Sequence, residues 1–157
     1  MTKEAFSDAV RRSEKKLYMS ALSVVANTED AADAVANALA YAWEHLDQLR
    51  DDEKIDAWLL QITYSEAKMI RRKTRHYADI DELADAFYYE TDHSDIEFFD
   101  ILTRARLDEK TNRIFMLYFL YGYTLPEIAE MTGEKLNTVK ARYYRALRKM
   151  ADMDGLL

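Results

Sequence analysis

The chain has 157 residues, with no cysteine, three glycines and one proline. Sheets need many turns and turns draw on Gly and Pro, so this composition excludes a β-rich protein and predicts an all-α fold. The absence of cysteine excludes disulfides and thiolate metal sites. No apolar run approaches the roughly 20 residues that a membrane span needs, and the N-terminus lacks the apolar core of a signal peptide. We therefore expect a cytoplasmic protein without membrane insertion.

The net charge of −7 is unevenly distributed. Residues 1–78 carry twelve Lys and Arg against thirteen Asp and Glu, which is close to neutral. Residues 79–100 carry nine acids and no base, whereas residues 101–157 carry ten bases and seven acids. Such asymmetry predicts a polyanion binder that uses its two ends while the middle stays away from phosphates.

The spacing of apolar residues predicts three long helices in the first half of the chain, over residues 4–26, 29–49 and 54–76. We expect Trp43 and Trp58 on the second and third of these helices to be core residues.

Residues 79–93 form an acidic stretch that we interpret as a linker with some transient helix. A capping box beginning at Ser94 predicts a helix of about a dozen residues after it. A further helix is expected from Asp108, with Gly122 as its natural C-terminal stop.

The next segment has the pattern of a helix-turn-helix. A capping box at Thr124 opens a short helix, Gly133 supplies a tight turn, and Asn137 or Thr138 caps a final helix that extends to Met150. Two helices joined in this way are a common device for binding the major groove of duplex DNA.

Between Lys135 and Lys149 the chain has six bases and no acid, on what we predict to be the exposed face of the last helix. Residues near the start of that helix are placed for base edges and the later bases for phosphates. The candidate DNA-binding residues are Thr124, Lys135, Asn137, Thr138, Lys140, Ala141, Arg142, Arg145, Arg148 and Lys149. A solvated basic face on a bundle helix is the alternative, which the capped helix, the Gly turn and the spacing disfavour.

An enzyme finds little support in this sequence. His45, His76 and His93 are isolated and lack the spacing of metal ligands, and there is neither a phosphate-binding Gly loop nor a cysteine nucleophile. We expect no catalytic activity, no metal, no cofactor and no small-molecule substrate.

The second half of the chain resembles region four of bacterial RNA polymerase sigma factors. The resemblance is to the extracytoplasmic-function (ECF) group of the sigma-70 family. The matching motifs, in order and spacing, are Glu127-Ile128-Ala129, Gly133, Thr138-Val139-Lys140, Arg142 and Arg145-Ala146. The resemblance implies that this module reads the −35 promoter element.

The first half is similar to sigma region two, with Trp58-Leu59-Leu60 and Ile62 matching its core motif. The resemblance implies a face that binds core RNA polymerase, formed by Glu29, Asp30, Asp33, Ala36 and Asn37. It also implies a set that handles the unwound −10 element, formed by Tyr64, Ser65, Lys68, Arg71, Arg72, Lys73 and Arg75. Tyr64 has two interpretations, a base-stacking ring or a half-buried packing residue.

The resemblance implies two small helical domains, residues 1–78 and 96–157, joined by an acidic linker, residues 79–95. It implies a subunit that directs core RNA polymerase to specific promoters, and an anti-sigma factor as a further partner. The chain departs from the family at Ala36 and Asn37, where Gln and Glu are usual, and at Ser65, where Asn is usual. An alternative is therefore a sigma-like DNA-binding regulator, or partial sigma factor, that needs a partner protein.

Overall fold

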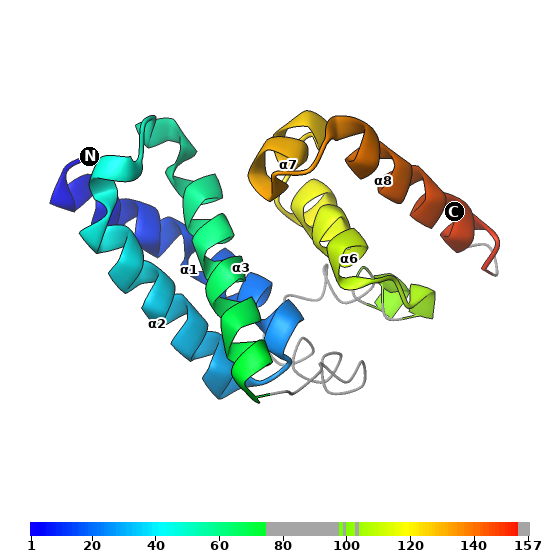
Figure 1. Ribbon diagram of the computed structural model, residues 1–157, viewed down its shortest axis with the longest axis horizontal. Helices are drawn as coiled ribbons and strands as arrows, with labels where there is room; N and C mark the ends of the chain where they lie inside the picture. The colour runs from blue at the N-terminus through cyan, green and yellow to red at the C-terminus, as the bar shows by residue number, and fades with distance from the viewer. Residues whose placement is uncertain (75–97, 99, 103, 154–157) are drawn as a thin grey trace. The chain divides into compact units, whose positions relative to one another are not determined.

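A computed structural model describes residues 1–74, 98, 100–102 and 104–153 (Figure 1). Its regular elements within those ranges are all helical, which confirms the predicted all-α fold. The chain divides into two compact units, Met1–Glu90 and Thr91–Leu157, as expected for two small helical domains. The predicted linker and the capping box at Ser94 lie outside the described residues. None of the described helices combines the length and the apolarity that crossing a bilayer would require.

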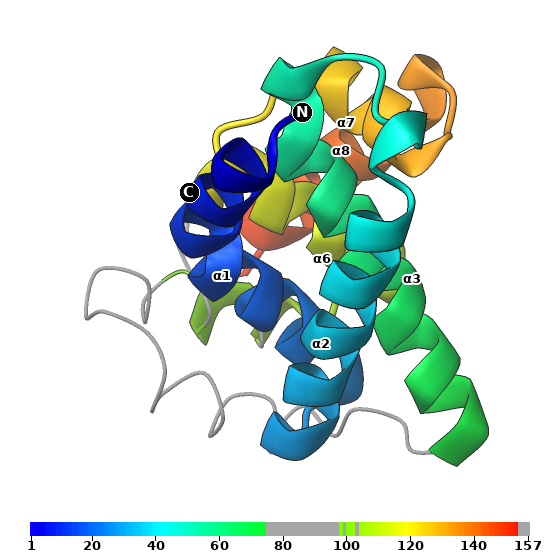
Figure 2. The ribbon, with the colours of Figure 1, turned by 90° about the vertical axis from the view of Figure 1, so that its left-hand side faces the viewer.

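The first unit contains three helices, α1 (Lys3–Val25), α2 (Thr28–Glu44) and α3 (Ile55–Thr74). Each packs against the other two, as the two views in Figures 1 and 2 show. Its largest fully buried side chains are aliphatic: Leu17, Leu22, Val24, Ile55, Leu59 and Leu60. Burial of such side chains contributes about 1.5–3 kcal/mol each, so this apolar centre is what holds α3 in place.

The second helix is shorter than predicted, because it ends at Glu44 and not near residue 49. Two 3-10 helices follow it, η1 (Leu46–Gln48) and η2 (Asp52–Lys54). The backbone N–H of Leu49 donates to the carbonyl of Leu46 at 3.1 Å, three residues back. Apolar residues three apart suit a 3-10 turn as well as an α-helix, so their spacing could not reveal this change.

The prediction that Trp43 is a core residue is wrong. Its side chain is 43% exposed, with one face against Phe6, at 5.4 Å between ring centroids, and the Lys3 ammonium 5.6 Å from the ring. The inward face of α2 is lined mostly by small residues, among them Ala38 and Ala42. Because these alanines let the helices approach closely, the large indole is left at the edge. Trp58 is half-buried.

The second unit contains α6 (Glu109–Phe115), a π-helical turn η3 (Met116–Leu120), α7 (Leu125–Thr132) and α8 (Leu136–Ala151). As predicted, a helix starts at this point of the chain, and Asp108 caps it, because its carboxylate accepts the N–H of Thr111 at 2.8 Å. Gly122 has φ +76°, a left-handed conformation that allows the chain to turn after the helix. The helix α8 packs against both α6 and α7.

Candidate nucleic-acid interface

The predicted capping box that opens α7 is present. The hydroxyl of Thr124 accepts the N–H of Glu127 at 3.2 Å, and the Glu127 carboxylate accepts the N–H of Thr124 at 3.1 Å. The helix ends at Gly133, whose φ of +71° gives the tight turn that the sequence predicted. These two features hold α7 and α8 as a helix-turn-helix.

The cap of α8 differs from the prediction. The helix begins at Leu136 with Lys135 at its N-cap, and no side chain caps it. The expectation that Asn137 or Thr138 caps it is therefore wrong, since both lie within the first turn, where they are exposed. The amide of Asn137 and the hydroxyl of Thr138 are therefore exposed on the first turn of α8.

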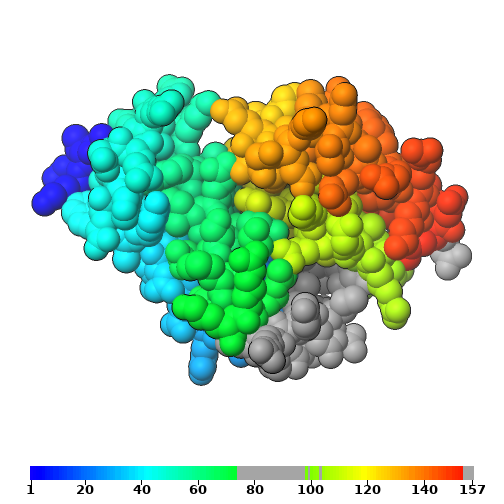
Figure 3. Space-filling view, viewed as in Figure 1, coloured from blue at the N-terminus to red at the C-terminus, as the bar shows by residue number. Residues whose placement is uncertain are grey.

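One side of α8 packs against the rest of the second unit. Val139, Tyr143, Ala146 and Met150 are buried, at intervals of three and four residues. At these intervals, the opposite side of the helix carries Asn137, Ala141 and Arg148, all exposed. Five bases on α8 and its cap are exposed and form no ion pair among the described residues: Lys135, Lys140, Arg145, Arg148 and Lys149. Figure 3 shows part of this orange-to-red surface.

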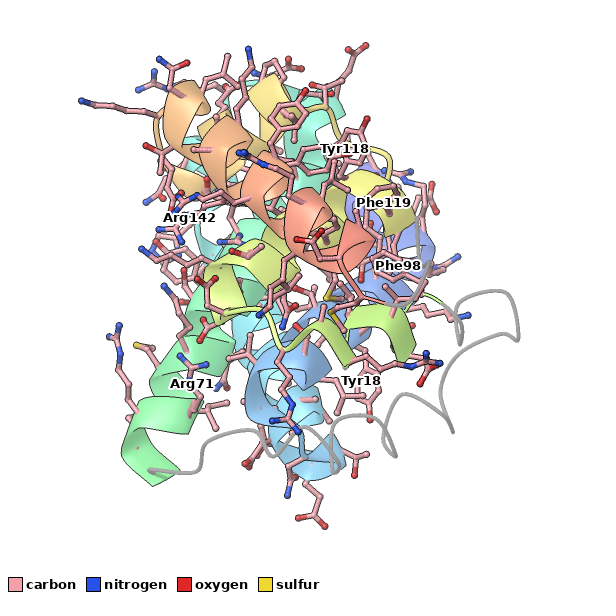
Figure 4. The ribbon with its side chains drawn as sticks, turned by 90° about the vertical axis from the view of Figure 1, so that its right-hand side faces the viewer. Tyr18, Arg71, Phe98, Tyr118, Phe119 and Arg142 are labelled. Carbon is pink, nitrogen blue, oxygen red and sulfur yellow. The ribbon has the colours of Figure 1, made fainter. Side chains whose placement is uncertain are left out.

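Arg142 is not part of the exposed face, contrary to the prediction. Its side chain is only 24% exposed and forms two ion pairs (Figure 4). Nε lies 3.4 Å from a carboxylate oxygen of Glu134, in the turn before α8, and one terminal nitrogen lies 3.6 Å from Asp108. Lys110 also lies 3.5 Å from Glu134. Arg142 thus joins α8 to the start of α6 and to the turn.

The pKa of Asp108, at the start of α6, agrees with these ion pairs. Partial burial acts to raise the pKa of Asp108, but the hydrogen bonds from Thr111 outweigh it, and the charges of Arg142 and Lys110 add to them. The pKa of Asp108 therefore lies below its ordinary value, and the carboxylate stays charged opposite Arg142.

Two exposed aromatic side chains, Tyr144 and Phe119, lie on and near α8. Tyr144 is 52% exposed and sits edge-on to Tyr143, with 5.2 Å between ring centroids. It falls on the same side of the helix as Ala141 and Arg148, so it belongs to the candidate interface. Phe119 is 49% exposed and lies 4.9 Å from Tyr118 between ring centroids (Figure 4).

The first unit brings the predicted polymerase-binding residues to one side of α2. Glu29, Asp33, Ala36 and Asn37 are exposed at intervals of three and four residues, and Asp30 is half-buried. Asp30 also takes part in the start of the helix, because its N–H donates to the Asn27 side chain at 3.0 Å.

The predicted single-strand set on α3 is only partly exposed. Ser65, Arg72 and Lys73 are exposed, Lys68 and Arg71 are half-buried, and Arg75 lies outside the described residues. Tyr64 is only 6% exposed, which agrees with its packing interpretation. The Lys68 ammonium lies 4.7 Å from the centre of the Tyr64 ring, so one face of that ring is covered.

Comparison with known proteins gives the same division of the chain. The family model for sigma-70 region 2 matches residues 9–77, and that for sigma-70 region 4 matches residues 105–150. The chain is 32% identical over 152 residues to RNA polymerase sigma factor SigV of Bacillus subtilis, covering 95% of this chain and 90% of that protein. It is 27% identical over 156 residues to the ECF RNA polymerase sigma factor SigM of Mycobacterium tuberculosis, covering 98% and 79%.

Two solved structures are similar as well. CnrH in complex with the cytosolic domain of CnrY is 25% identical, with a TM-score of 0.68 over 97% of this chain and 88% of that one. Sigma factor RpoE of Bartonella quintana, in complex with the anti-sigma factor NepR, is 21% identical, with a TM-score of 0.71 over 96% of both chains. The second likeness is one of fold.

Proposed function

Because the chain belongs to the ECF group of the sigma-70 family of RNA polymerase sigma factors, we propose that its two helical units divide promoter recognition between them. As a sigma factor it directs core RNA polymerase to specific promoters for the initiation of transcription. The surfaces of α2, α3 and α8 each carry out one part of promoter recognition.

The second unit binds the −35 element, with α8 in the major groove. The observation that carries this assignment is the surface of α8 and its N-cap, where five exposed bases have no ion-pair partner among the described residues. Asn137, Thr138, Lys140 and Ala141 lie in its first turns, where a recognition helix contacts base edges. Arg145, Arg148 and Lys149 follow, and they neutralise backbone phosphates. Thr124 lies at the exposed start of α7 and contributes a phosphate contact.

The first unit binds core polymerase through the exposed side of α2 and the −10 element through α3. The acidic residues Glu29 and Asp33 complement a basic partner surface. On α3, the basic residues Lys68, Arg71, Arg72 and Lys73 attract the unpaired strand. Since the Tyr64 ring is buried, we assign it to packing, with Lys68 held above it.

The protein acts by binding rather than by catalysis, since its family consists of transcription factors, and it works in the cytoplasm, where polymerase meets the chromosome. An anti-sigma factor is a further partner. This part of the proposal is supported by RpoE, whose structure contains the anti-sigma factor NepR, and by CnrH, whose structure contains the cytosolic domain of CnrY.

Run-off transcription with purified core polymerase tests the proposal, on promoter fragments recovered with the polymerase–protein complex. We expect the chain to support initiation, and the combined Lys140→Ala and Arg145→Ala variant to lose most of it while still binding core. Arg11→Ala is the control, because Arg11 is an exposed base on α1, a helix that carries none of the proposed contact residues. Failure of the wild-type chain to bind core at low salt would refute the proposal.

Ala36 and Asn37 are exposed on α2 where the family usually has Gln and Glu, so a second variant tests the alternative of a partial sigma factor. If Ala36→Gln with Asn37→Glu raises the affinity for core polymerase by an order of magnitude or more, the natural chain needs a partner to compensate. An unchanged affinity supports a self-sufficient sigma factor.

A further inference from the structure

A hollow of about 350 Å³ lies in the second unit, beside α8 and the segment that leads into α6. On the α8 side it is lined by Arg142, Arg145 and Lys149, and on the other side by Arg106 and Asp108. Four cations and one carboxylate therefore line one small concave surface. Since Asp108 pairs with Arg142, the charges of Arg106, Arg145 and Lys149 remain uncompensated among the described residues. A concave surface with this excess of positive charge attracts an anion.

Arg106 has an unusual backbone conformation, with φ +49°. This left-handed region is uncommon for residues other than Gly, Asn and Asp, and it costs backbone energy. Arg106 follows the buried Ala105 and precedes Asp108, the capping residue of α6, by two positions. Its side chain lines the hollow. The backbone strain at φ +49° therefore falls on a residue whose charged side chain lines the hollow.

The hollow adjoins the DNA-binding side of α8. Arg142, Arg145 and Lys149 follow one another at three and four residues, so they form one stripe along the helix. Arg145 lies at the border of this stripe and of the outward side that carries Ala141 and Arg148. A duplex lying along the outward side would therefore have one of its backbones close to the hollow.

We propose that this hollow is a phosphate-binding subsite, in which Arg106, Arg145 and Lys149 hold a phosphate of the DNA backbone beside the groove that α8 occupies. The inference rests on the proposed function of α8 and adds to it Arg106, which lies outside the helix-turn-helix. Arg142 lines the subsite but is held by Glu134 and Asp108, so it positions the surface and contributes less charge. The contact is independent of sequence, because a phosphate carries no base identity.

The test measures the affinity of the full chain for a short random-sequence duplex between about 50 and 200 mM salt. The informative variant is Arg106→Gly, because glycine accepts φ +49° without strain and the backbone is preserved. We expect the affinity to fall severalfold and the slope of log affinity against log salt to flatten by about 0.9, which corresponds to one phosphate contact. Arg106→Lys keeps the positive charge, so its slope of log affinity against log salt should stay close to that of the wild type.

Arg104→Ala is the matched control. Arg104 is an exposed arginine two residues away, it pairs with Asp100, and it does not line the hollow. Its removal should leave the slope at the wild-type value. Thermal unfolding of each variant shows whether the fold is retained.

A wild-type slope for Arg106→Gly overturns the inference while leaving the proposed function of α8 intact. If the wild-type chain binds no duplex at all, both fail. A titration with inorganic phosphate at constant ionic strength distinguishes a free anion from the DNA backbone. If millimolar phosphate binds the wild-type chain, and the salt dependence of duplex binding by Arg106→Gly equals that of the wild type, the hollow is a site for a free anion. That result would overturn the inference.

Discussion

Replacing Arg142 by alanine should destabilise the second unit more than it weakens any direct contact with DNA. The guanidinium joins α8 to Glu134 in the preceding turn, at 3.4 Å, and to Asp108 at the start of α6, at 3.6 Å. Removing it leaves Glu134, whose side chain is only 19% exposed, without this partner. The structure therefore assigns Arg142 a role in holding the helix-turn-helix against α6.

The size of the effect follows from the exposure of the pair. Exposed ion pairs contribute about 0.2–1 kcal/mol, whereas removing one partner of a fully buried pair costs about 3–5 kcal/mol. The Arg142 and Glu134 side chains are 24% and 19% exposed, which places them between these limits. We expect a loss of about 1–3 kcal/mol in the free energy of unfolding. In a domain of this size each kcal/mol lowers the melting temperature by about 4–8 °C.

The assay is thermal unfolding of the full chain, followed by duplex binding well below the transition. Lys140→Ala is the matched control, since Lys140 is an exposed base on the same helix and forms no ion pair among the described residues. It should lower DNA affinity without moving the transition. In a double-mutant cycle, Glu134→Gln should recover part of the stability lost in Arg142→Ala. If Arg142→Ala instead unfolds like the wild type and loses affinity as Lys140→Ala does, the positioning role is refuted.

Three further changes test other parts of the structure. Burial acts to raise the pKa of Asp56, but hydrogen bonds from Arg12 and Ser13, together with the positive charges of Arg12 and Lys16, outweigh it and hold the pKa below its ordinary value. The unfolded chain then binds more protons, so this contribution to stability is lost as the pH falls below about 4, and unfolding curves of Asp56→Asn should show a smaller loss over that range. Thr124→Ala removes the capping box and should cost about 1 kcal/mol in urea unfolding of the second unit, with no change expected in the first. Tyr64→Phe should leave affinity for a −10 single strand unchanged, because the Tyr64 side chain is buried; a marked loss in a filter-binding assay would show that its hydroxyl reaches DNA.

Local rules account for most of what the sequence predicted about the fold. The capping residues Asp108 and Thr124 and the glycines Gly122 and Gly133 each act through bonds or dihedrals within a few residues. Such features are readable without knowledge of the partners. The exposure of Trp43 is different, because it depends on how closely other helices approach α2. That approach is set by alanines whose effect exists only once three helices are packed together.

The candidate site shows the same limit within a single helix. Arg142 and Arg145 are both arginines on α8, three residues apart, yet one is held in ion pairs and the other is exposed. The difference comes from Asp108, which lies more than thirty residues earlier in the chain, and from Glu134 in the turn. Arg106 is the converse case, since no motif marks it and only its conformation and its place at the hollow reveal it.

The remaining charge on α8 leads to a prediction about DNA binding by the chain without polymerase. Six bases occur from Lys135 to Lys149, and with Arg142 neutralised five remain to release counterions. If each of these five bases neutralised one phosphate, a slope of about 0.9 each would make a fourfold rise in salt lower the affinity roughly 500-fold, and the assignment of Lys140 to base edges makes this an upper limit. The chain as a whole carries a charge of −7, which opposes approach to DNA at longer range. We therefore expect the free chain to bind DNA weakly at physiological salt. In the proposed division of tasks, docking of the first unit on polymerase would make the −35 contact effectively intramolecular, so that weak contacts at two promoter elements combine by effective concentration.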